Sequence, residues 1–259
     1  MVKLEFDDEG SRLVEEYNAS AGATARRARI LKALALKPGD HVLDVGSGPG
    51  HQAFEMSPVV GSNGRVEGVD ASESAIEIAQ HRCSGLSNVG FRVGNAYRLP
   101  FEDATFDAVM SSQVFEYLDD VASALAEVFR VLKSGGRVLI HDTEYGALLW
   151  QSSDADRMAQ IMKTWDGHLA DPHLPQTLGK KLADAGFKAV QAEPVVHVET
   201  SYDPSSASAI LIKFVVGYVV SQGESQGKAD AWADDLSKMG SNGNYFFSSN
   251  EYIFTADKP

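Results

Sequence analysis

The sequence predicts an α/β protein with a doubly wound, mostly parallel sheet. Three observations predict it. Apolar runs alternate with helical patterns between residues 36 and 145, a glycine-rich turn follows the first run, and the last segment returns to a strand pattern after a long insertion. Right-handed crossovers then set the hand of the winding. The expected strands of the parallel part are 41–44, 65–70, 89–93, 106–111 and 137–141, and its expected helices start near 52 and cover 73–82 and 121–132.

The remaining segments are expected to complete a single domain over residues 1–259. An apolar stripe predicts an N-terminal helix over 11–35. Met158, Ile161, Met162 and Trp165 recur at helical spacing, and a second helical pattern stops at Gly186. Strand patterns over 188–200 and 244–256 bring the expected sheet to seven strands, the last one antiparallel. We expect a core of about 36–145 and 186–259, with a helical cap or insertions at about 146–185 and 204–240.

Composition limits the classes of partner and compartment. The chain has 259 residues and a formal net charge of −13, which argues against nucleic acid and anionic membranes as partners, because phosphate contacts need clustered Lys and Arg. Cys83 is the only cysteine, so no internal disulfide or zinc thiolate cluster is expected. The first ten residues lack the apolar core of a signal peptide, and the longest apolar run, 209–220, is too short to span a bilayer. A cytoplasmic location is the default expectation.

The segment His41-Val-Leu-Asp-Val-Gly-Ser-Gly-Pro-Gly50 predicts a ligand cradle. Three alternate glycines, Gly46, Gly48 and Gly50, let bare backbone approach a ligand, and the N–H groups of the following helix point to the same place. Asp70 ends the second strand, twenty residues beyond Gly50, where a carboxylate can bind both hydroxyls of a ribose. A structural role for Asp70, capping the helix that starts near Ser72, is the alternative.

Two details favour a cationic ligand over a dinucleotide. The glycines are spaced Gly-x-Gly-x-Gly rather than Gly-x-Gly-x-x-Gly, and Asp44 stands two residues before the first of them. A carboxylate there repels a pyrophosphate but attracts a ligand that carries an ammonium group and a sulfonium.

These motifs together resemble those of class I S-adenosylmethionine-dependent methyltransferases, whose fold is Rossmann-like. Leu43–Gly50 resembles the first motif, Gly68–Ser72 the ribose-binding second motif and Gly94–Phe101 the third, and 106–109 with 132–139 match the fourth strand and the approach to the fifth. The segment 243–256 resembles the final strand of the ubiquinone/menaquinone-type, small-molecule branch. The resemblance implies that S-adenosyl-L-methionine is the cofactor and S-adenosyl-L-homocysteine the product. It implies these cofactor-binding residues: Tyr17, Asp44, Gly46, Ser47, Gly48, Gly50, Asp70, Ala71, Asn95, Ala96, Ser111 and Gln113.

Two of these residues have an open alternative. The family usually has Asp where this chain has Asn95, whose carbonyl oxygen could accept a bond from the adenine amino group; the alternative is an Asn that only forms a turn. Tyr17 resembles an aromatic residue that closes over the cofactor, or it is a packing tyrosine.

The acceptor residues are expected on the loop after the fifth strand. His141 is the candidate catalytic base, because ligands gather at the carboxyl ends of parallel strands, although a lone His is more often structural. Asp142, Glu144 and Tyr145 follow it and could hold a cationic or hydroxylated acceptor. Trp150 and Trp165 are expected in the core rather than in the wall of a site.

The sequence therefore predicts transfer of a methyl group to an O, N or C atom of a small-molecule acceptor by in-line displacement. No metal is expected to take part. The alternatives are a nicotinamide-dependent oxidoreductase that uses the same glycines and acid, and a non-catalytic protein that only binds S-adenosylmethionine. The sequence does not indicate the oligomeric state.

Overall fold

A computed structural model describes residues 8–259, with side chains from Arg12 onward. Residues 1–7, which belong to the segment without a signal-peptide pattern, lie outside the described residues. The chain divides into two compact units. We call the one with 27–143, 173–195 and 251–259 the sheet unit. The other, with the residues before Arg27, 144–172 and 196–250, is the helical unit.

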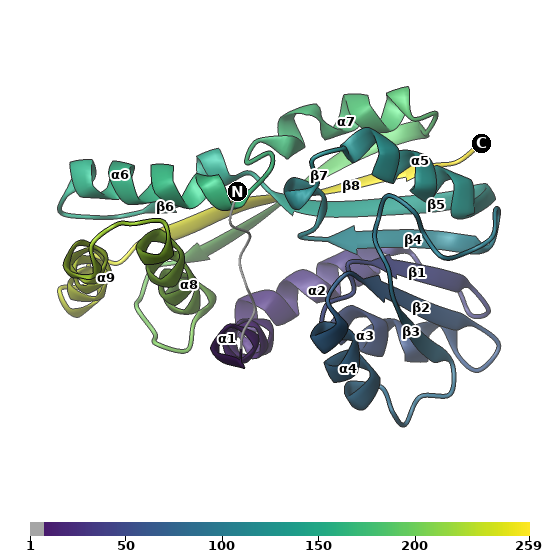
Figure 1. Cartoon of the computed structure of the whole chain (residues 1–259), viewed down its shortest axis with the longest axis horizontal. Helices are drawn as coiled ribbons and strands as arrows, with labels where there is room; N and C mark the ends of the chain where they lie inside the picture. The colour runs from purple at the N-terminus through teal and green to yellow at the C-terminus, as the bar shows by residue number, and fades with distance from the viewer. Residues whose placement is uncertain (1–7) are drawn as a thin grey trace. The chain divides into compact units, whose positions relative to one another are not determined.

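The sheet unit contains the predicted parallel sheet. Its strands are β1 (His41–Val45), β2 (Arg65–Asp70), β3 (Val89–Val93), β4 (Phe106–Ser112) and β5 (Leu132–Thr143), in the order β3-β2-β1-β4-β5, and every pair in this order is parallel (Figure 1). The C-terminal strand β8 (Phe247–Asp257) lies antiparallel to β5, with Arg137 opposite Asp257 and Thr143 opposite Glu251. The predicted fold class is confirmed.

Among residues 8–259 the sheet has eight strands rather than the expected seven. Leu149–Trp150 forms a short strand, β6, that pairs with Ser248 and Phe247 at the start of β8, and β7 (Lys188–Glu199) also pairs with β8. A strand of two residues is too short to show the alternation of apolar and polar residues that predicts strands, so β6 was not expected. β5 also starts five residues earlier than expected, because the turn at Gly135, where φ is +76°, is included in the strand.

Side chains that alternate along β1 divide the core of the sheet unit into two layers. Leu43 and Val45 belong to a cluster with α5 (Val121–Val131) and α7 (Leu174–Asp184), whereas Val42 belongs to a cluster with the end of α2 (Ala21–Leu34) and with α3 (His51–Val60). α4 (Glu73–Arg82) begins at Ser72, whose hydroxyl accepts a bond from the N–H of Ala75 at 3.2 Å. Both faces of the sheet are therefore covered, as parallel sheets require.

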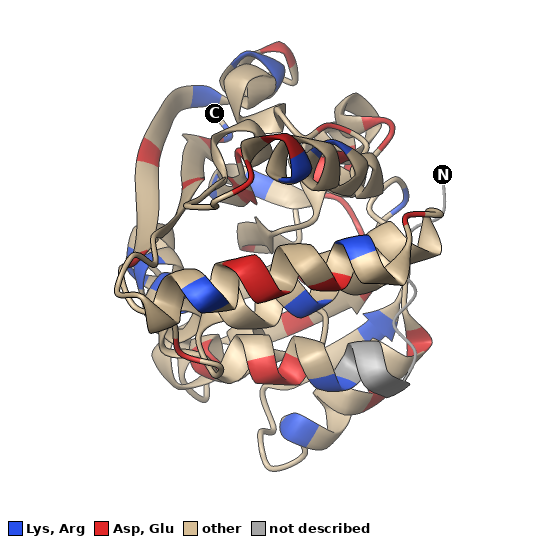
Figure 2. Cartoon of the chain, turned by 90° about the vertical axis from the view of Figure 1, so that its left-hand side faces the viewer, with Lys and Arg blue, Asp and Glu red and all other residues tan. Residues whose placement is uncertain are grey.

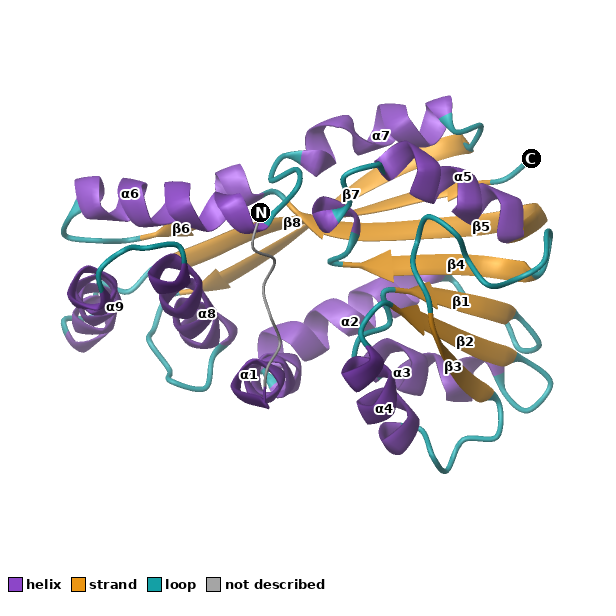
Figure 3. Cartoon of the chain, viewed as in Figure 1, coloured by secondary structure: helices purple, strands orange, loops and turns teal. Residues whose placement is uncertain are grey.

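The helical unit is built from α1 (Asp8–Ala19), α6 (Ala155–Trp165), α8 (Ala207–Ser221) and α9 (Gln226–Ser241), and α6, α8 and α9 pack on one another (Figure 3). The predicted helix over 11–35 is two helices, α1 and α2, with a break at Ser20. The hydroxyl of Ser20 accepts a bond from the N–H of Ala23 at 3.2 Å, which caps the second helix. None of the described helices is long and apolar enough to cross a membrane.

The bonds that Lys258 makes near the C-terminus to the end of α5 can be tested by substitution. Its Nζ donates to the carbonyl oxygens of Phe129 and Leu132, at 2.6 and 2.7 Å, at the end of α5. Because these carbonyls lack helical partners, we expect Lys258→Met to lower the free energy of unfolding by about 1–2 kcal/mol. The measurement is urea denaturation followed by circular dichroism.

Lys180→Met is the matched control, because the Lys180 side chain is 78% exposed and only pairs with Asp184 within its own helix. An exposed pair of this kind contributes little, so the control should stay within about 0.5 kcal/mol of the parent. Equal effects of the two substitutions would contradict a capping role for Lys258.

Candidate active site

The glycine loop after β1 adopts the backbone that the sequence predicts. Gly46, Gly48 and Gly50 have φ values of +74°, +49° and +81°, the left-handed region that favours glycine. The N–H groups of Gly46 and Ser47 both donate to the carbonyl of Val69, at 2.7 and 3.0 Å, so the loop is tied to the end of β2. Gly50 then caps the N-terminus of α3.

The three glycines are needed for different reasons. A Cβ on Gly46 would lie 2.2 Å from a methyl group of Val114, and a Cβ on Gly50 would lie 2.9 Å from Ala79. Both positions are closed by packing within the protein. A Cβ on Gly48 would meet nothing within 4 Å, so the backbone there faces open space. Gly48 is therefore the glycine at which a ligand has room to approach.

Asp70 binds the same loop. Its Oδ2 accepts a bond from the N–H of Gly48 at 2.8 Å, and its Oδ1 accepts one from the N–H of Ser72 at 2.9 Å. Ser72, rather than Asp70, caps α4 with its side chain. A carboxylate has about four acceptor positions, so Asp70 keeps acceptor capacity for hydroxyl groups, with Ala71 beside it.

Asp44 carries the least compensated charge in the loop. It is only 2% exposed, and burial together with the charge of Asp70 raises its pKa to about 7. Asp44 Oδ2, Ser47 Oγ and Gln52 Nε2 are all buried and have no hydrogen-bond partner among the described residues. Because buried polar atoms are nearly always paired in native proteins, these three atoms fit a polar, cationic ligand.

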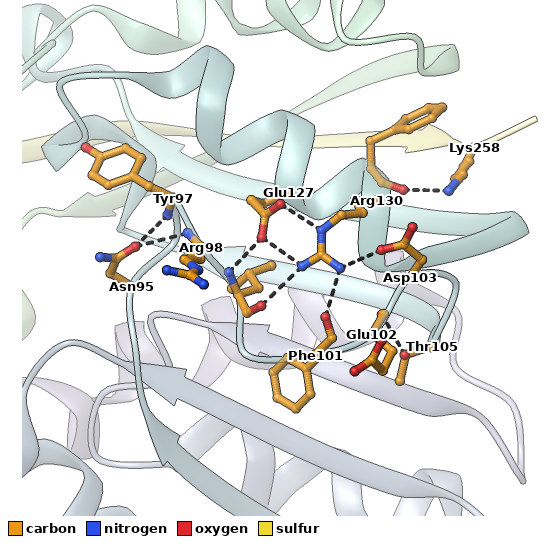
Figure 4. A network of polar contacts seen from close by, with 12 residues as sticks. Asn95, Tyr97, Arg98, Phe101, Glu102, Asp103, Thr105, Glu127, Arg130 and Lys258 are labelled. Atoms are coloured by element: carbon orange, nitrogen blue, oxygen red, sulfur yellow. Dashed lines mark hydrogen bonds and ion pairs between the residues drawn. The ribbon is translucent and has the colours of Figure 1, made fainter.

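Asn95 forms a turn. Its Oδ1 accepts bonds from the N–H groups of Tyr97 and Arg98, at 2.9 and 3.1 Å, so the carbonyl oxygen expected to bind adenine is already occupied (Figure 4). An amide NH₂ cannot accept these bonds, and the side chain therefore keeps its NH₂ group for a ligand. Ala96, the next residue, is 8% exposed.

Arg130 holds the segment that follows this turn. Its guanidinium donates to the carbonyls of Leu99 and Phe101 and to Glu127, while Glu127 accepts the N–H of Leu99 at 2.8 Å (Figure 4). Arg130 also donates to Asp103 at 2.8 Å, and its bonds to the two carboxylates raise the pKa of Arg130. This pair was not among the predicted site residues, although the spacing of Glu127 and Arg130, one helical turn apart, is a sequence signal for it.

The predicted residues at the tip of β4 are held by other parts of the sheet unit. Ser111 is 1% exposed, and its hydroxyl donates to the carbonyl of Val45 at 2.8 Å. Gln113 has a φ of +59°, and its amide exchanges bonds with the hydroxyl of Thr143, at 2.8 and 3.2 Å. Both residues therefore lie beside the end of β1 or β5, and Gln113 sits in a strained backbone conformation that is typical of functional loops.

His141 lies inside β5, two residues before its end, and is fully buried. Its Nδ1 is 3.0 Å from Ser112 Oγ, and its Nε2 is 3.0 Å from Glu251 Oε2. Glu251 is 110 residues further along the chain, so no local sequence pattern indicates that it pairs with His141. The ring is thus held at both nitrogens, and its role as a base stays a prediction.

The aromatic candidates Tyr17, Trp150 and Trp165 belong to the helical unit. Arg26 Nη1 donates to the hydroxyl of Tyr17 at 2.9 Å, and contact of Tyr17 with the cofactor stays a prediction. Trp165 is 2% exposed and stacks on His168, with ring centroids 3.7 Å apart. Burial lowers the pKa of His168 to about 4. Trp150 packs edge-on against Trp232, so both predicted core tryptophans are in the core.

The comparisons with known proteins agree with this geometry. The family described as "Methyltransferase domain" matches residues 36–186, which hold the glycine loop, Asp70, Asn95 and His141. The chain belongs to this methyltransferase-domain family. The match covers more than half of the chain and most of the predicted parallel sheet.

Two curated relatives are similar to this methyltransferase domain. An uncharacterized 37.1 kDa protein of transposon Tn4556 from Streptomyces fradiae is 31% identical over 196 residues, which are 74% of this chain and 55% of that protein. Demethylmenaquinone methyltransferase from Lactococcus lactis is 38% identical over 124 residues, which are 47% of this chain and 49% of that enzyme. The chain thus spans about half the length of the curated relatives it matches.

A solved structure shares the fold of the methyltransferase domain. Phosphoethanolamine N-methyltransferase 2 of Haemonchus contortus, in complex with S-adenosyl-L-methionine, is 22% identical with a TM-score of 0.67. The match covers 99% of this chain and 58% of that one.

The contact between Gly46 and Val114 can be tested by a double-mutant cycle. We expect Gly46→Ala to lower the free energy of unfolding well beyond the cost of a left-handed alanine, because its Cβ meets the Val114 side chain. Gly243→Ala is the control, since Gly243 has a similar φ of +70°, ends α9 in the left-handed turn typical of helix C-termini, and has nothing within 4 Å of its Cβ position.

Val114→Ala removes the methyl group that clashes, so the double variant should recover part of the loss. The coupling between the two sites should exceed about 0.5 kcal/mol by urea denaturation. Additive effects would show that the loop relaxes away from Val114.

Proposed function

We propose that this chain transfers a methyl group from S-adenosyl-L-methionine to a small-molecule acceptor, releasing S-adenosyl-L-homocysteine. The observation that carries the proposal is the buried Asp44, whose unpartnered oxygen lies at the end of the strand that enters the glycine loop. A buried carboxylate disfavours a pyrophosphate and favours an ammonium and a sulfonium. Membership of the methyltransferase-domain family supports the same cofactor.

In this proposal the cofactor is bound by the residues that the resemblance implies. Asp44, Gly46 and Ser47 bind its methionyl end, Gly48 and Gly50 shape the loop, and Asp70 with Ala71 binds the ribose. Asn95 and Ala96 flank the adenine, with Asn95 acting through its NH₂ group. Ser111 and Gln113 lie beside the sulfonium, and a role for Tyr17 in cofactor binding rests on the resemblance alone.

Bound S-adenosylmethionine supplies a methyl group that its sulfonium already activates. The protein therefore contributes mainly by positioning and by excluding water. The burial of Asp44, Ser111 and His141 keeps polar groups of the protein in a dry environment, where each charge acts more strongly than in water. A base is needed only where the acceptor atom must lose a proton. His141, positioned by Ser112 and Glu251, is the predicted base.

The acceptor is a small molecule methylated on O, N or C. The names of the relatives support a small acceptor, since one is a demethylmenaquinone methyltransferase and another a phosphoethanolamine N-methyltransferase. We propose a cytoplasmic protein without a nucleic-acid or membrane partner. The net charge of −13 supports the absence of nucleic-acid and membrane partners, as do the Lys and Arg positions scattered among Asp and Glu on the helices that face the viewer in Figure 2.

Binding of S-adenosylhomocysteine by calorimetry, compared with a fluorescence titration with NADH, tests the cofactor. We expect binding of the first and none of the second. The reverse result would support the nicotinamide-dependent alternative and overturn the proposal. Transfer of a labelled methyl group to a small acceptor would then exclude a protein that only binds the cofactor.

The pKa of Asp44 predicts how cofactor affinity depends on pH. With a pKa of about 7 the carboxyl is mostly protonated at pH 6 and mostly ionised at pH 8. Only the ionised form attracts the ligand's ammonium group, so the affinity for S-adenosylhomocysteine should rise about tenfold from pH 6 to pH 8. Calorimetry at both pH values measures it.

Asp44→Asn provides the control, because the amide does not titrate. Its affinity should be lower than the parent's at pH 8 and nearly independent of pH. A variant that keeps the parent's pH dependence would show that another group titrates.

A further inference from the structure

Three carboxylates are buried where β4, β5 and β8 meet. Glu116, Asp142 and Glu251 are 0%, 1% and 5% exposed. Glu116 accepts the N–H of Thr143 at 2.9 Å, and Glu251 pairs with His141. Asp142 differs from the other two, because its Oδ2 is buried and has no hydrogen-bond partner among the described residues. A buried, unpaired oxygen of this kind needs an explanation.

The other oxygen of Asp142 anchors the loop after β4. Its Oδ1 accepts the N–H of Val114 at 3.1 Å, and the backbone N–H groups of Phe115 and Glu116 nearby also favour the ionised carboxyl. Val114 is the residue whose methyl group fills the space over Gly46. Val114 therefore connects the carboxyl of Asp142 with Gly46, which is assigned to the methionyl end of the cofactor.

The segments of β4, β5 and β8 that hold these acids carry no Lys or Arg to balance them. The segments 106–119, 138–143 and 251–257 contain no Lys and no Arg. His141 is their one basic residue, and its ring is held by Ser112 and Glu251. An anionic acceptor finds no positive partner in these segments, whereas an ammonium group would compensate a buried carboxylate.

Burial raises the pKa of Asp142 to about 8, although the backbone N–H groups of residues 114–116 oppose the rise. Without a neighbouring cation the carboxyl is therefore mostly protonated at neutral pH, and an ammonium group bound beside it favours the ionised form. Because burial raises the proton affinity of this carboxylate, it can take a proton from the bound ammonium group, which an ordinary aspartate does poorly.

We propose that Asp142 faces the acceptor and that the acceptor is an amine. This rests on the methyl transfer proposed above. The ammonium form of the acceptor gives one proton to Asp142, and the nitrogen lone pair that is freed attacks the methyl carbon. The new N–C bond forms as the C–S bond breaks, and the electron pair of that bond remains on sulfur. Asp142 later returns its proton to solvent, so protons and charges balance.

The test uses the full chain and sets of three small compounds, each set with a primary amine, an alcohol and a carboxylate on the same carbon skeleton. Methyl transfer from labelled S-adenosylmethionine is measured for each compound, and its binding to the protein loaded with S-adenosylhomocysteine is measured by saturation-transfer NMR. We expect the amines to be bound and methylated about tenfold or more in preference to the other members of each set.

Asp142→Asn keeps an oxygen for the backbone N–H groups and removes the proton acceptor. We expect kcat/KM for the preferred amine to fall by about 100-fold or more, with the acidic limb of its pH profile lost and the affinity for S-adenosylhomocysteine unchanged. Asp184→Asn, at a side chain that is 62% exposed, should leave all three measurements as in the parent.

Preference for the alcohols or carboxylates, failure of every amine to bind, or an unchanged pH profile in Asp142→Asn would each overturn this assignment. Failure to bind S-adenosylhomocysteine would instead overturn the proposed methyl transfer. The two failures are therefore distinguished by the binding measurement alone.

Discussion

The candidate site depends on the close approach of Val114 to the backbone of Gly46. No other residue type has room at position 46, because a Cβ would overlap the valine methyl group. The same contact brings the β4 loop onto the loop that follows β1, although the two are nearly seventy residues apart in sequence. The carboxyl of Asp142 accepts a bond from the N–H of Val114 and so holds the β4 loop in place. Three strands are thereby joined at their carboxyl ends, which is where a doubly wound sheet places its ligands.

This packing explains why acidic groups persist in a dry environment. Burying a carboxylate is costly unless it is paired, and three acids of the sheet unit have partners: Asp70 pairs with the backbone of Gly48, Glu116 with Thr143, and Glu251 with His141. Asp44 and Asp142 each keep one oxygen without a partner, and the pKa of each is raised by burial. Unpaired buried acids with raised pKa values are typical of functional sites rather than of scaffolds.

The helical unit contains a half-buried acid that serves structure. Glu199 accepts bonds from His197 and from the hydroxyl and N–H of Ser208, and these bonds lower its pKa to about 2 against the effect of burial. The hydroxyl of Tyr245 lies 2.5 Å from Ser208 Oγ and continues the chain of bonds. Both oxygens of Glu199 are used, and the carboxylate fixes the start of α8. Asp142 differs from Glu199, because one oxygen of Asp142 has no partner among the described residues and is left for a ligand.

The sequence by itself determined the fold class, the bounds of β2, β3 and α4, and the order of the glycine loop and Asp70. These features depend on residues that lie close together in the chain, where hydrophobic period and glycine conformation act locally. Tertiary structure decided the rest. It paired His141 with Glu251, placed Val114 over Gly46 and added β6 to the sheet, because each of these depends on the register between distant strands. Asn95 shows what the motif could not determine. The N–H groups of Tyr97 and Arg98 occupy the side-chain oxygen that the resemblance assigned to adenine, and only the tertiary structure shows this.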